Sequence, residues 1–117
     1  MGAWDALRRG GVEASFVSIN ETTAVEGAHG LHFTADHTID EIRNHPADAI
    51  ALPGGATGTE NLYQSEKVRE LITTQLEDDR LVGAMCAAPS VLGRMGVLRG
   101  KRATAYPGWE KYLEGAE

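Results

Sequence analysis

Two short apolar runs, each followed at once by small residues, constrain the fold of this chain most strongly. Residues 48–52, DAIAL, are followed by PGG, and residues 80–85, RLVGAM, are followed by CAAP. Runs of this length predict buried strands, and apolar residues between them recur at helical spacing. Strands that alternate with helices indicate an α/β fold built on a mainly parallel sheet.

Periodicity and the positions of glycine and proline predict the other elements. A helix is expected to begin after Ser65, a typical N-cap residue, and the residues before it are expected to form a polar loop. A hairpin is expected within residues 25–36. The further elements that we expect are helices over 3–9, 40–44, 89–94 and 109–114, and strands over 12–19 and 101–106.

Composition limits the classes of function. The 117 residues suit one domain over 1–117, and 42% hydrophobic residues are enough for a core. A net charge of −6 argues against nucleic acid and anionic membranes as partners, since both attract basic surfaces. One cysteine cannot form an internal disulfide, and neither a signal peptide nor a membrane span is evident, so we expect a cytoplasmic protein.

Cys86 follows a predicted strand and precedes a predicted helix. In α/β sheets, ligands bind beyond the carboxyl ends of strands, and a sharp turn around a nucleophile requires small neighbours. The positive end of a helix dipole favours the thiolate form of a nearby cysteine. We expect the N–H of Ala87 to point at the reacting centre, and the loop after residue 52 to supply a second donor. The alternative is a buried structural cysteine, which is equally common.

Three segments resemble the ThiJ/PfpI superfamily, also written DJ-one/PfpI: WDALRRGGVEASFVSI, ALPGGATGTENL and VGAMCAAPSVLGRMGVLRGKRATAYP. The most specific parts are the LPGG loop and the A-x-C-A-[AG]-P turn. The resemblance implies that Cys86 is the reactive cysteine and that the N–H groups of Gly55 and Ala87 bind an oxyanion. It also implies that Gly54 and Tyr106 line the substrate pocket. Ala87 stands where the protease-like branch has histidine, which favours the branch of glyoxalase-like, deglycase-like and stress-response proteins.

The same resemblance implies a flavodoxin-like open sheet with helices on both faces. Family members begin with a strand and a glutamate that bonds the reactive cysteine, and they continue past residue 117 with further strands and a helix. We therefore expect an internal fragment that lacks the first strand and the C-terminal elements. No glutamate of this chain is assigned the missing role, and we expect the chain alone to turn over little methylglyoxal.

The resemblance leaves several functions open. The first is a cofactor-independent hydrolase or lyase, of the glyoxalase or deglycase type, that acts on small reactive carbonyls such as methylglyoxal. The second is a non-catalytic redox sensor or a holdase-like chaperone of oxidative stress, whose Cys86 becomes oxidised. A class I glutaminase is disfavoured, since no histidine follows His45. The resemblance also leaves room for a homodimer.

Other motifs give weaker signals. The four histidines, at positions 29, 32, 37 and 45, run through predicted turns without cysteine or carboxylate at ligand spacing, so we expect no metal. The GGATG segment lacks the lysine of a phosphate loop, and we expect no cofactor. Ser90 lies close to Cys86, but no histidine at a defined offset supports a serine triad.

Overall fold

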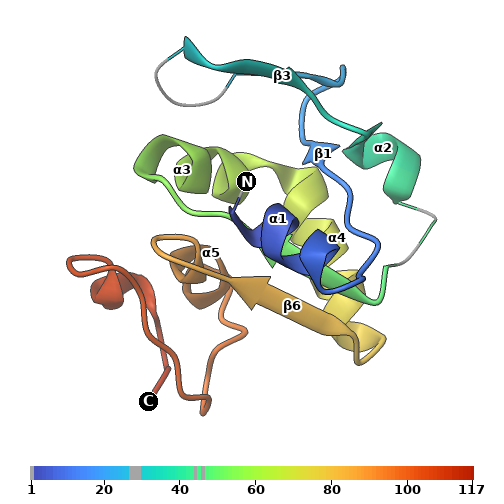
Figure 1. The fold of residues 1–117 in the computed structure, drawn as a ribbon. Coiled ribbons are helices and arrows are strands. Elements are labelled where there is room, and N and C mark those ends of the chain that lie inside the picture. Colours follow the sequence, from blue (N-terminus) through green and yellow to red (C-terminus); the bar gives the residue numbers. More distant parts are fainter. Residues whose placement is uncertain (1, 27–29, 44, 46) are drawn as a thin grey trace. The chain divides into compact units, whose positions relative to one another are not determined.

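The structure is a computed structural model that describes residues 2–26, 30–43, 45 and 47–117 (Figure 1). It divides into two compact units, Met1–His45 and Pro46–Glu117. Each unit contains a pair of parallel strands together with helices, so the predicted α/β class is confirmed. The assignment of residues 1–117 to one domain stays a prediction.

The first unit combines a helix with two small strand pairs. β1 (Val17–Ser18) pairs in parallel with β4 (His37–Thr38), and β2 (Ala24–Glu26) pairs in antiparallel fashion with β3 (His32–Thr34). The predicted hairpin is thereby confirmed, although residues 27–29 of its connection lie outside the described residues. The helices of this unit are α1 (Gly2–Arg9) and α2 (Ile39–Ile42), and both coincide closely with predicted helices.

The strand predicted over residues 12–19 is much shorter in the structure. Only Val17 and Ser18 pair as a strand, because the backbone before them is bound in other ways. The carbonyl of Ala14 accepts hydrogen bonds from the side chains of Trp4 and Arg8, and the N–H of Phe16 donates to the carboxylate of Asp36 at 2.8 Å. Side chains therefore satisfy backbone groups that a ladder would otherwise use.

The second unit contains the two predicted buried strands and the helices that follow them. β5 (Ala49–Leu52) and β6 (Leu81–Ala84) pair in parallel, as the sequence predicts. The helices are α3 (Ala56–Gln64), α4 (Glu66–Glu77) and α5 (Pro89–Arg94), followed by the 3₁₀ helix η2 (Glu110–Tyr112). The buried apolar residues of this unit are Leu52, Val68, Ile72, Ala87, Ala88, Val91 and Leu92.

A buried amide fixes α4 to the start of the strand pair. Gln75, which is 2% exposed, donates from its side-chain nitrogen to the carbonyls of Ala47 at 2.9 Å and Leu81 at 3.3 Å. A buried polar group costs little when its hydrogen bonds are made, so Gln75 holds α4 against the segments at the starts of β5 and β6 without a penalty. The two strands therefore begin side by side and run in the same direction toward the candidate site.

Three predictions for this unit need correction. Residues 56–64, expected as a loop, form α3, because Gly55 lets the chain turn and Thr59 N–H bonds back to the Gly55 carbonyl at 2.8 Å. Residues 101–106 are not a strand: isolated hydrogen bonds join them to the segment 115–117 instead. The helix expected over 109–114 is reduced to η2.

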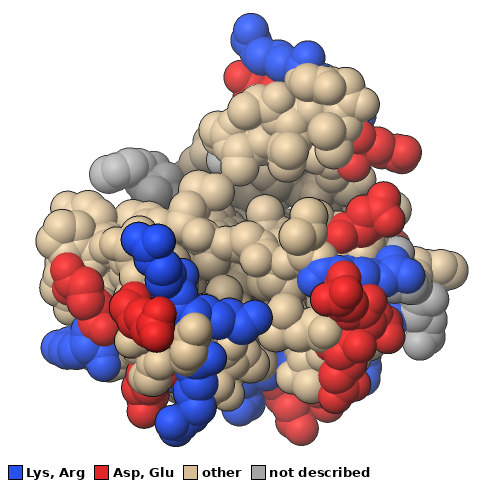
Figure 2. Space-filling view, turned by 90° about the horizontal axis from the view of Figure 1, so that it is seen from below, with Lys and Arg blue, Asp and Glu red and all other residues tan. Residues whose placement is uncertain are grey.

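Within the described ranges, no helix is both long and apolar enough to cross a lipid bilayer. On the face that Figure 2 shows, lysine and arginine side chains lie next to aspartate and glutamate side chains, with both signs interspersed. A broad basic surface of the kind that binds nucleic acid is not present on that face.

Candidate functional site

Two loops leave the strand pair at the same level. Leu52, the last residue of β5, is paired with Ala84, the last residue of β6, and the N–H of Met85 continues the pairing to the Leu52 carbonyl at 3.3 Å. The PGG loop and the turn that contains Cys86 therefore emerge side by side. This position is the carboxyl edge of a parallel sheet, where α/β proteins bind their ligands.

Cys86 lies in a backbone conformation that L-residues rarely adopt. Its φ is 59°, in the left-handed region, and its side chain is exposed. The N–H of Ala88 closes the turn by donating to the carbonyl of Met85 at 3.0 Å, and α5 begins directly afterward. A left-handed residue other than glycine is held there only by its surroundings, and such residues concentrate at functional sites.

Gly54 packs against Cys86 so closely that no side chain fits. A Cβ atom added at Gly54 would lie 2.5 Å from Cys86 Cβ, 3.2 Å from its sulfur and 3.2 Å from the carbonyl oxygen of Met85. The absence of a side chain at residue 54 thus allows the two loops to touch at the thiol. The structure brings together Gly54 and Cys86, which the sequence predicted as parts of one site.

Two backbone N–H groups next to this contact are not engaged. Among the described residues, neither Gly55 nor Ala87 donates its N–H to a protein acceptor. Gly55 has a φ of 93° and caps α3, whereas Ala87 is buried and its carbonyl accepts the hydroxyl of Ser90 at 2.6 Å. The Ser90 hydroxyl is thus part of the turn. Unengaged N–H groups at such positions can bind an anion or a developing oxyanion.

Tyr106 reaches the site through its backbone. Its N–H donates to the carbonyl of Cys86 at 2.8 Å, while its side chain is 58% exposed. This bond ties the segment after residue 100 to the turn, so the backbone of Tyr106 lies next to that of Cys86. Its place in a substrate pocket, like that of Gly54, stays a prediction.

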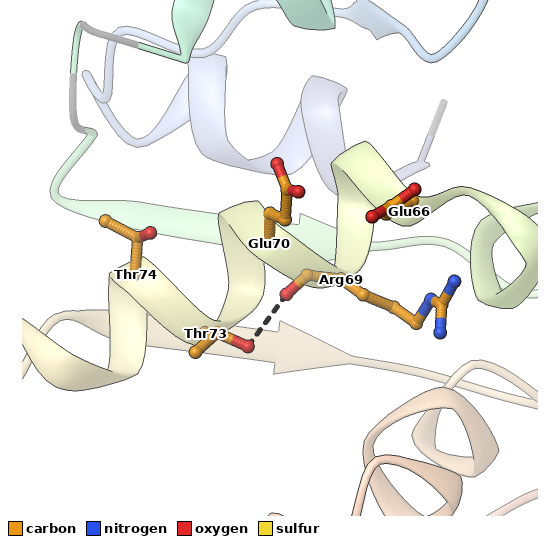
Figure 3. A pocket seen from close by; sticks show the side chains of 5 residues that line it. All are labelled: Glu66, Arg69, Glu70, Thr73 and Thr74. Carbon is orange, nitrogen blue, oxygen red and sulfur yellow. Dashed lines mark hydrogen bonds between the residues drawn. The ribbon is translucent and has the colours of Figure 1, made fainter.

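A hollow of about 400 Å³ lies elsewhere in this unit, on the outer surface of α4 (Figure 3). All its lining side chains come from that one helix, and they diverge from one another: Glu66, Arg69, Glu70, Thr73 and Thr74. The dashed line marks the Thr73 hydroxyl bound to the carbonyl of Arg69 at 2.9 Å, which is a contact within the helix. None of the five residues of the predicted site lines this hollow, and the side chains around it do not converge on a ligand.

The histidines do not assemble a metal centre in the part of the chain that the structure describes, where no three potential ligands gather. His29 lies outside the described residues. His37 contacts the carboxylate of Glu41 at 3.3 Å, one helical turn further along. The interpretation of the histidines as exposed loop residues needs correction: His32 and His37 are exposed but begin the strands β3 and β4, and of these three only His45 lies outside a helix or strand.

Sequence reasoning missed one group of side chains, which joins the two helices that follow the loops. Arg94, at the end of α5, contacts Glu60 of α3 through an Nη1–Oε2 distance of 2.9 Å. Hydrogen bonds from Gln64 and from Arg94 to the Glu60 carboxylate lower the pKa of Glu60. Glu60 and Gln64 are four residues apart, a recognisable helical spacing, but nothing local in the sequence connects Glu60 with a residue in α5.

Comparison with known proteins identifies relatives for most of the chain. Protein DJ-1 homolog B of Arabidopsis thaliana is 38% identical over 104 residues, which are 88% of this chain and 24% of that protein. The glutathione-independent glyoxalase DJR-1.2 of Caenorhabditis elegans is 32% identical over 95% of this chain and 59% of its own length. A deglycase of Pyrococcus horikoshii is 32% identical over 87% of this chain and 60% of its own. The chain thus spans between a quarter and three fifths of these relatives.

Solved structures show the same fold. A mutant of a DJ-1 superfamily protein from Salmonella typhimurium superposes with a TM-score of 0.91 at 28% identity, over 96% of this chain and 61% of that one. The oxidized form of Toxoplasma gondii DJ-1 superposes with a TM-score of 0.88 at 33% identity, over 97% of this chain and 64% of that one. The sequence model of the DJ-1/PfpI family matches residues 1–117. Its match over the whole chain, together with these neighbours, shows that the chain belongs to the DJ-1/PfpI family.

Proposed function

We propose that this chain carries the reactive-cysteine segment of a protein that acts on small reactive carbonyls such as methylglyoxal. The observation that supports the proposal most directly is the turn at Cys86. There an exposed thiol in a left-handed conformation touches Gly54 and lies beside the unengaged N–H groups of two flanking positions. Such a thiol is accessible to a small electrophile and has donors nearby for the charge that develops.

The proposed reaction needs no cofactor. The thiolate of Cys86 adds to the aldehyde carbon of methylglyoxal, a C–S bond forms, and the carbonyl π electrons move to oxygen. The N–H groups of Gly55 and Ala87 are proposed to stabilise that oxyanion, which is protonated to a hemithioacetal. A base then moves the proton from the former aldehyde carbon to its neighbour, which leaves a thioester. Water hydrolyses the thioester to lactate and releases the thiol, so the net reaction converts methylglyoxal and water into lactate.

The proton transfer requires a carboxylate or another base. No acidic residue of this chain is assigned to that step. The names of two relatives, a glyoxalase and a deglycase, support reactive carbonyls as the substrate class. We propose the cytoplasm as the compartment and leave a homodimer as the proposed assembly.

The test measures lactate formed from methylglyoxal by the purified chain and by its Cys86→Ser variant. A saturable rate that the variant loses supports the proposal. Because the chain spans only part of its relatives, the same assay is run on the chain extended to the full reading frame, if one surrounds it. Equal rates for wild type and variant in every form would overturn the proposal.

A second function, redox sensing, is favoured by the same exposed thiol and by a relative whose solved structure is of the oxidized protein. In this alternative the thiolate attacks one oxygen of hydrogen peroxide, an S–O bond forms as the O–O bond breaks, and the products are a sulfenic acid on Cys86 and hydroxide. Mass spectrometry of peroxide-treated chain distinguishes the functions. Stepwise gain of oxygen at Cys86 without any lactate production supports the sensor. A sensor of this kind is proposed to act as a stress-response or holdase-like protein.

A further inference from the structure

Arg94 joins three elements of the second unit through its side chain. Its guanidinium bonds Glu60 at 2.9 Å, its central carbon lies 3.6 Å from the ring centroid of Tyr63, and the same carbon lies 5.7 Å from the ring of Tyr112. Glu60 and Tyr63 belong to α3, and Tyr112 belongs to η2. We call these four residues the Arg94 cluster.

The contacts fix the guanidinium in direction as well as in position. A separation of 3.6 Å is that of a flat guanidinium stacked on a ring, which is the geometry that arginine favours over lysine. The second carboxylate oxygen of Glu60 accepts a hydrogen bond from the side chain of Gln64 at 2.9 Å. The carboxylate is therefore held from both sides, and the Arg94 side chain is only 25% exposed.

The two helices that the cluster joins carry the two loops of the candidate site. Gly55 is the N-cap of α3, and the turn of Cys86 and Ala87 leads directly into α5. The loops touch where Gly54 packs on Cys86. The helices α3 and α5 also pack against each other. The Arg94 cluster adds a directional link between them, because an ion pair and a stacked guanidinium fix geometry more narrowly than apolar packing does.

We propose that Arg94 is a positioning residue for the thiol of Cys86. Its stacking on Tyr63 and its pairing with Glu60 hold α3 against α5, so that the N–H of Gly55 points toward the sulfur. This inference rests on the proposed role of the Gly55 N–H in the reaction. It adds to that role a residue on another helix that determines where the donor lies.

The test compares Arg94→Ala and Arg94→Lys with Arg102→Ala, which removes the same charge from an exposed position outside the cluster. Three quantities are measured at a temperature at which every variant is folded: the rate of Cys86 alkylation by iodoacetamide, the NMR shift of the Gly55 amide, and lactate production. Arg94→Ala should slow alkylation about fivefold, as expected for partial loss of a hydrogen bond to a thiolate. The alkylation rate of Arg94→Lys should lie between those of wild type and Arg94→Ala, since lysine keeps the charge and loses the flat stacking.

Two controls separate positioning from general destabilisation. Ile72→Val weakens the core of the same unit, and it should lower the melting temperature without changing the alkylation rate or the Gly55 shift. The second control is the double variant that combines Glu60→Arg with Arg94→Glu and so restores an ion pair of reversed direction. Its Cys86 alkylation rate should recover at least about a third of the loss seen in Arg94→Glu alone.

The outcomes distinguish this inference from the proposed function. If wild type makes no lactate but Arg94→Ala still slows alkylation and moves the Gly55 resonance, the positioning role stands and the carbonyl reaction fails. If wild type is active and Arg94→Ala matches Arg102→Ala in all three quantities, the positioning role is overturned and the reaction stands.

Discussion

At the scale of single residues, the close contact between Gly54 and Cys86 makes a sharp prediction. Gly54→Ala places a methyl group 2.5 Å from Cys86 Cβ, so either the loop or the turn must move. We expect a loss of about 1–3 kcal/mol in the free energy of unfolding, the usual cost of overpacking. Urea denaturation measures it, and the iodoacetamide rate at Cys86 should change in the same variant.

Gly58→Ala provides the matched control, because the residue lies inside α3 and a Cβ atom there meets no heavy atom within 4 Å beyond its chain neighbours and the backbone of its own helix. Alanine favours a helix over glycine, so this variant should be as stable as wild type or more stable by about 0.5–1 kcal/mol. Equal losses at positions 54 and 58 would contradict the close contact.

The left-handed backbone at Cys86 predicts an unusual stability change. Cys86→Gly and Cys86→Ala both remove the thiol, but glycine adopts a φ of 59° without strain and alanine does not. The glycine variant should be more stable than the alanine variant by about 1 kcal/mol. The comparison uses midpoints of chemical denaturation. A more stable alanine variant would show that the turn is not strained in solution.

Glu60 carries a prediction for pH. Hydrogen bonds from Gln64 and Arg94 lower the pKa of its carboxyl in the folded chain. A lowered folded pKa means that the contribution to stability is present above the ordinary glutamate pKa and is lost as the pH falls through the folded value. NMR titration of Glu60 should therefore show a low pKa, and Gln64→Ala should raise it. If the pKa of Glu60 does not rise in that variant, the hydrogen bond from Gln64 is not the main cause of the lowered value.

At the scale of elements, α4 begins at a capped residue. The hydroxyl of Ser65 accepts a hydrogen bond from the N–H of Val68 at 3.3 Å, which satisfies one of the free donors at the helix start. Ser65→Ala should lower the free energy of unfolding by about 1 kcal/mol. Ser65→Asp keeps an acceptor and should retain most of that stability. A loss of the same size in both variants would contradict the capping role.

Element by element, local sequence predicted what depends on local physics. The helix starting after Ser65 and the strands 49–52 and 81–84 follow from a cap and from short apolar runs, and the structure confirms them. Residues 56–64 were expected as a loop because ATGTENLYQ is polar and contains glycine and two threonines. That helix gains its stability from contacts with α4 and α5, which the local sequence does not contain.

The remaining errors also have distant causes. Residues 12–16 lose their strand because side chains of α1 and Asp36 take their backbone groups. Within the candidate site, the sequence predicted Cys86 and the PGG loop, since small residues after a strand are a local signal. The role of Arg94 could not be predicted locally, because its partners lie on another helix and on η2.

At the scale of the whole molecule, the structure describes two compact units, and every residue of the candidate site lies in the second. The family match covers all 117 residues, whereas the relatives compared above extend well beyond them. The geometry that concerns Cys86 is nevertheless contained in the second unit. The local arrangement of thiol, loop and turn can therefore be tested on this chain, separately from turnover.

The most direct test of the account compares Cys86 alkylation in the folded chain and in the same chain unfolded in urea. The measurement uses iodoacetamide at neutral pH, and the thiol is already exposed in the folded chain. We expect the folded chain to react about tenfold faster, because the unengaged N–H groups of Gly55 and Ala87 flank the exposed sulfur, and preorganised donors beside a nucleophile stabilise the transition state. A folded chain that reacts at the unfolded rate, or more slowly, would contradict an activated cysteine.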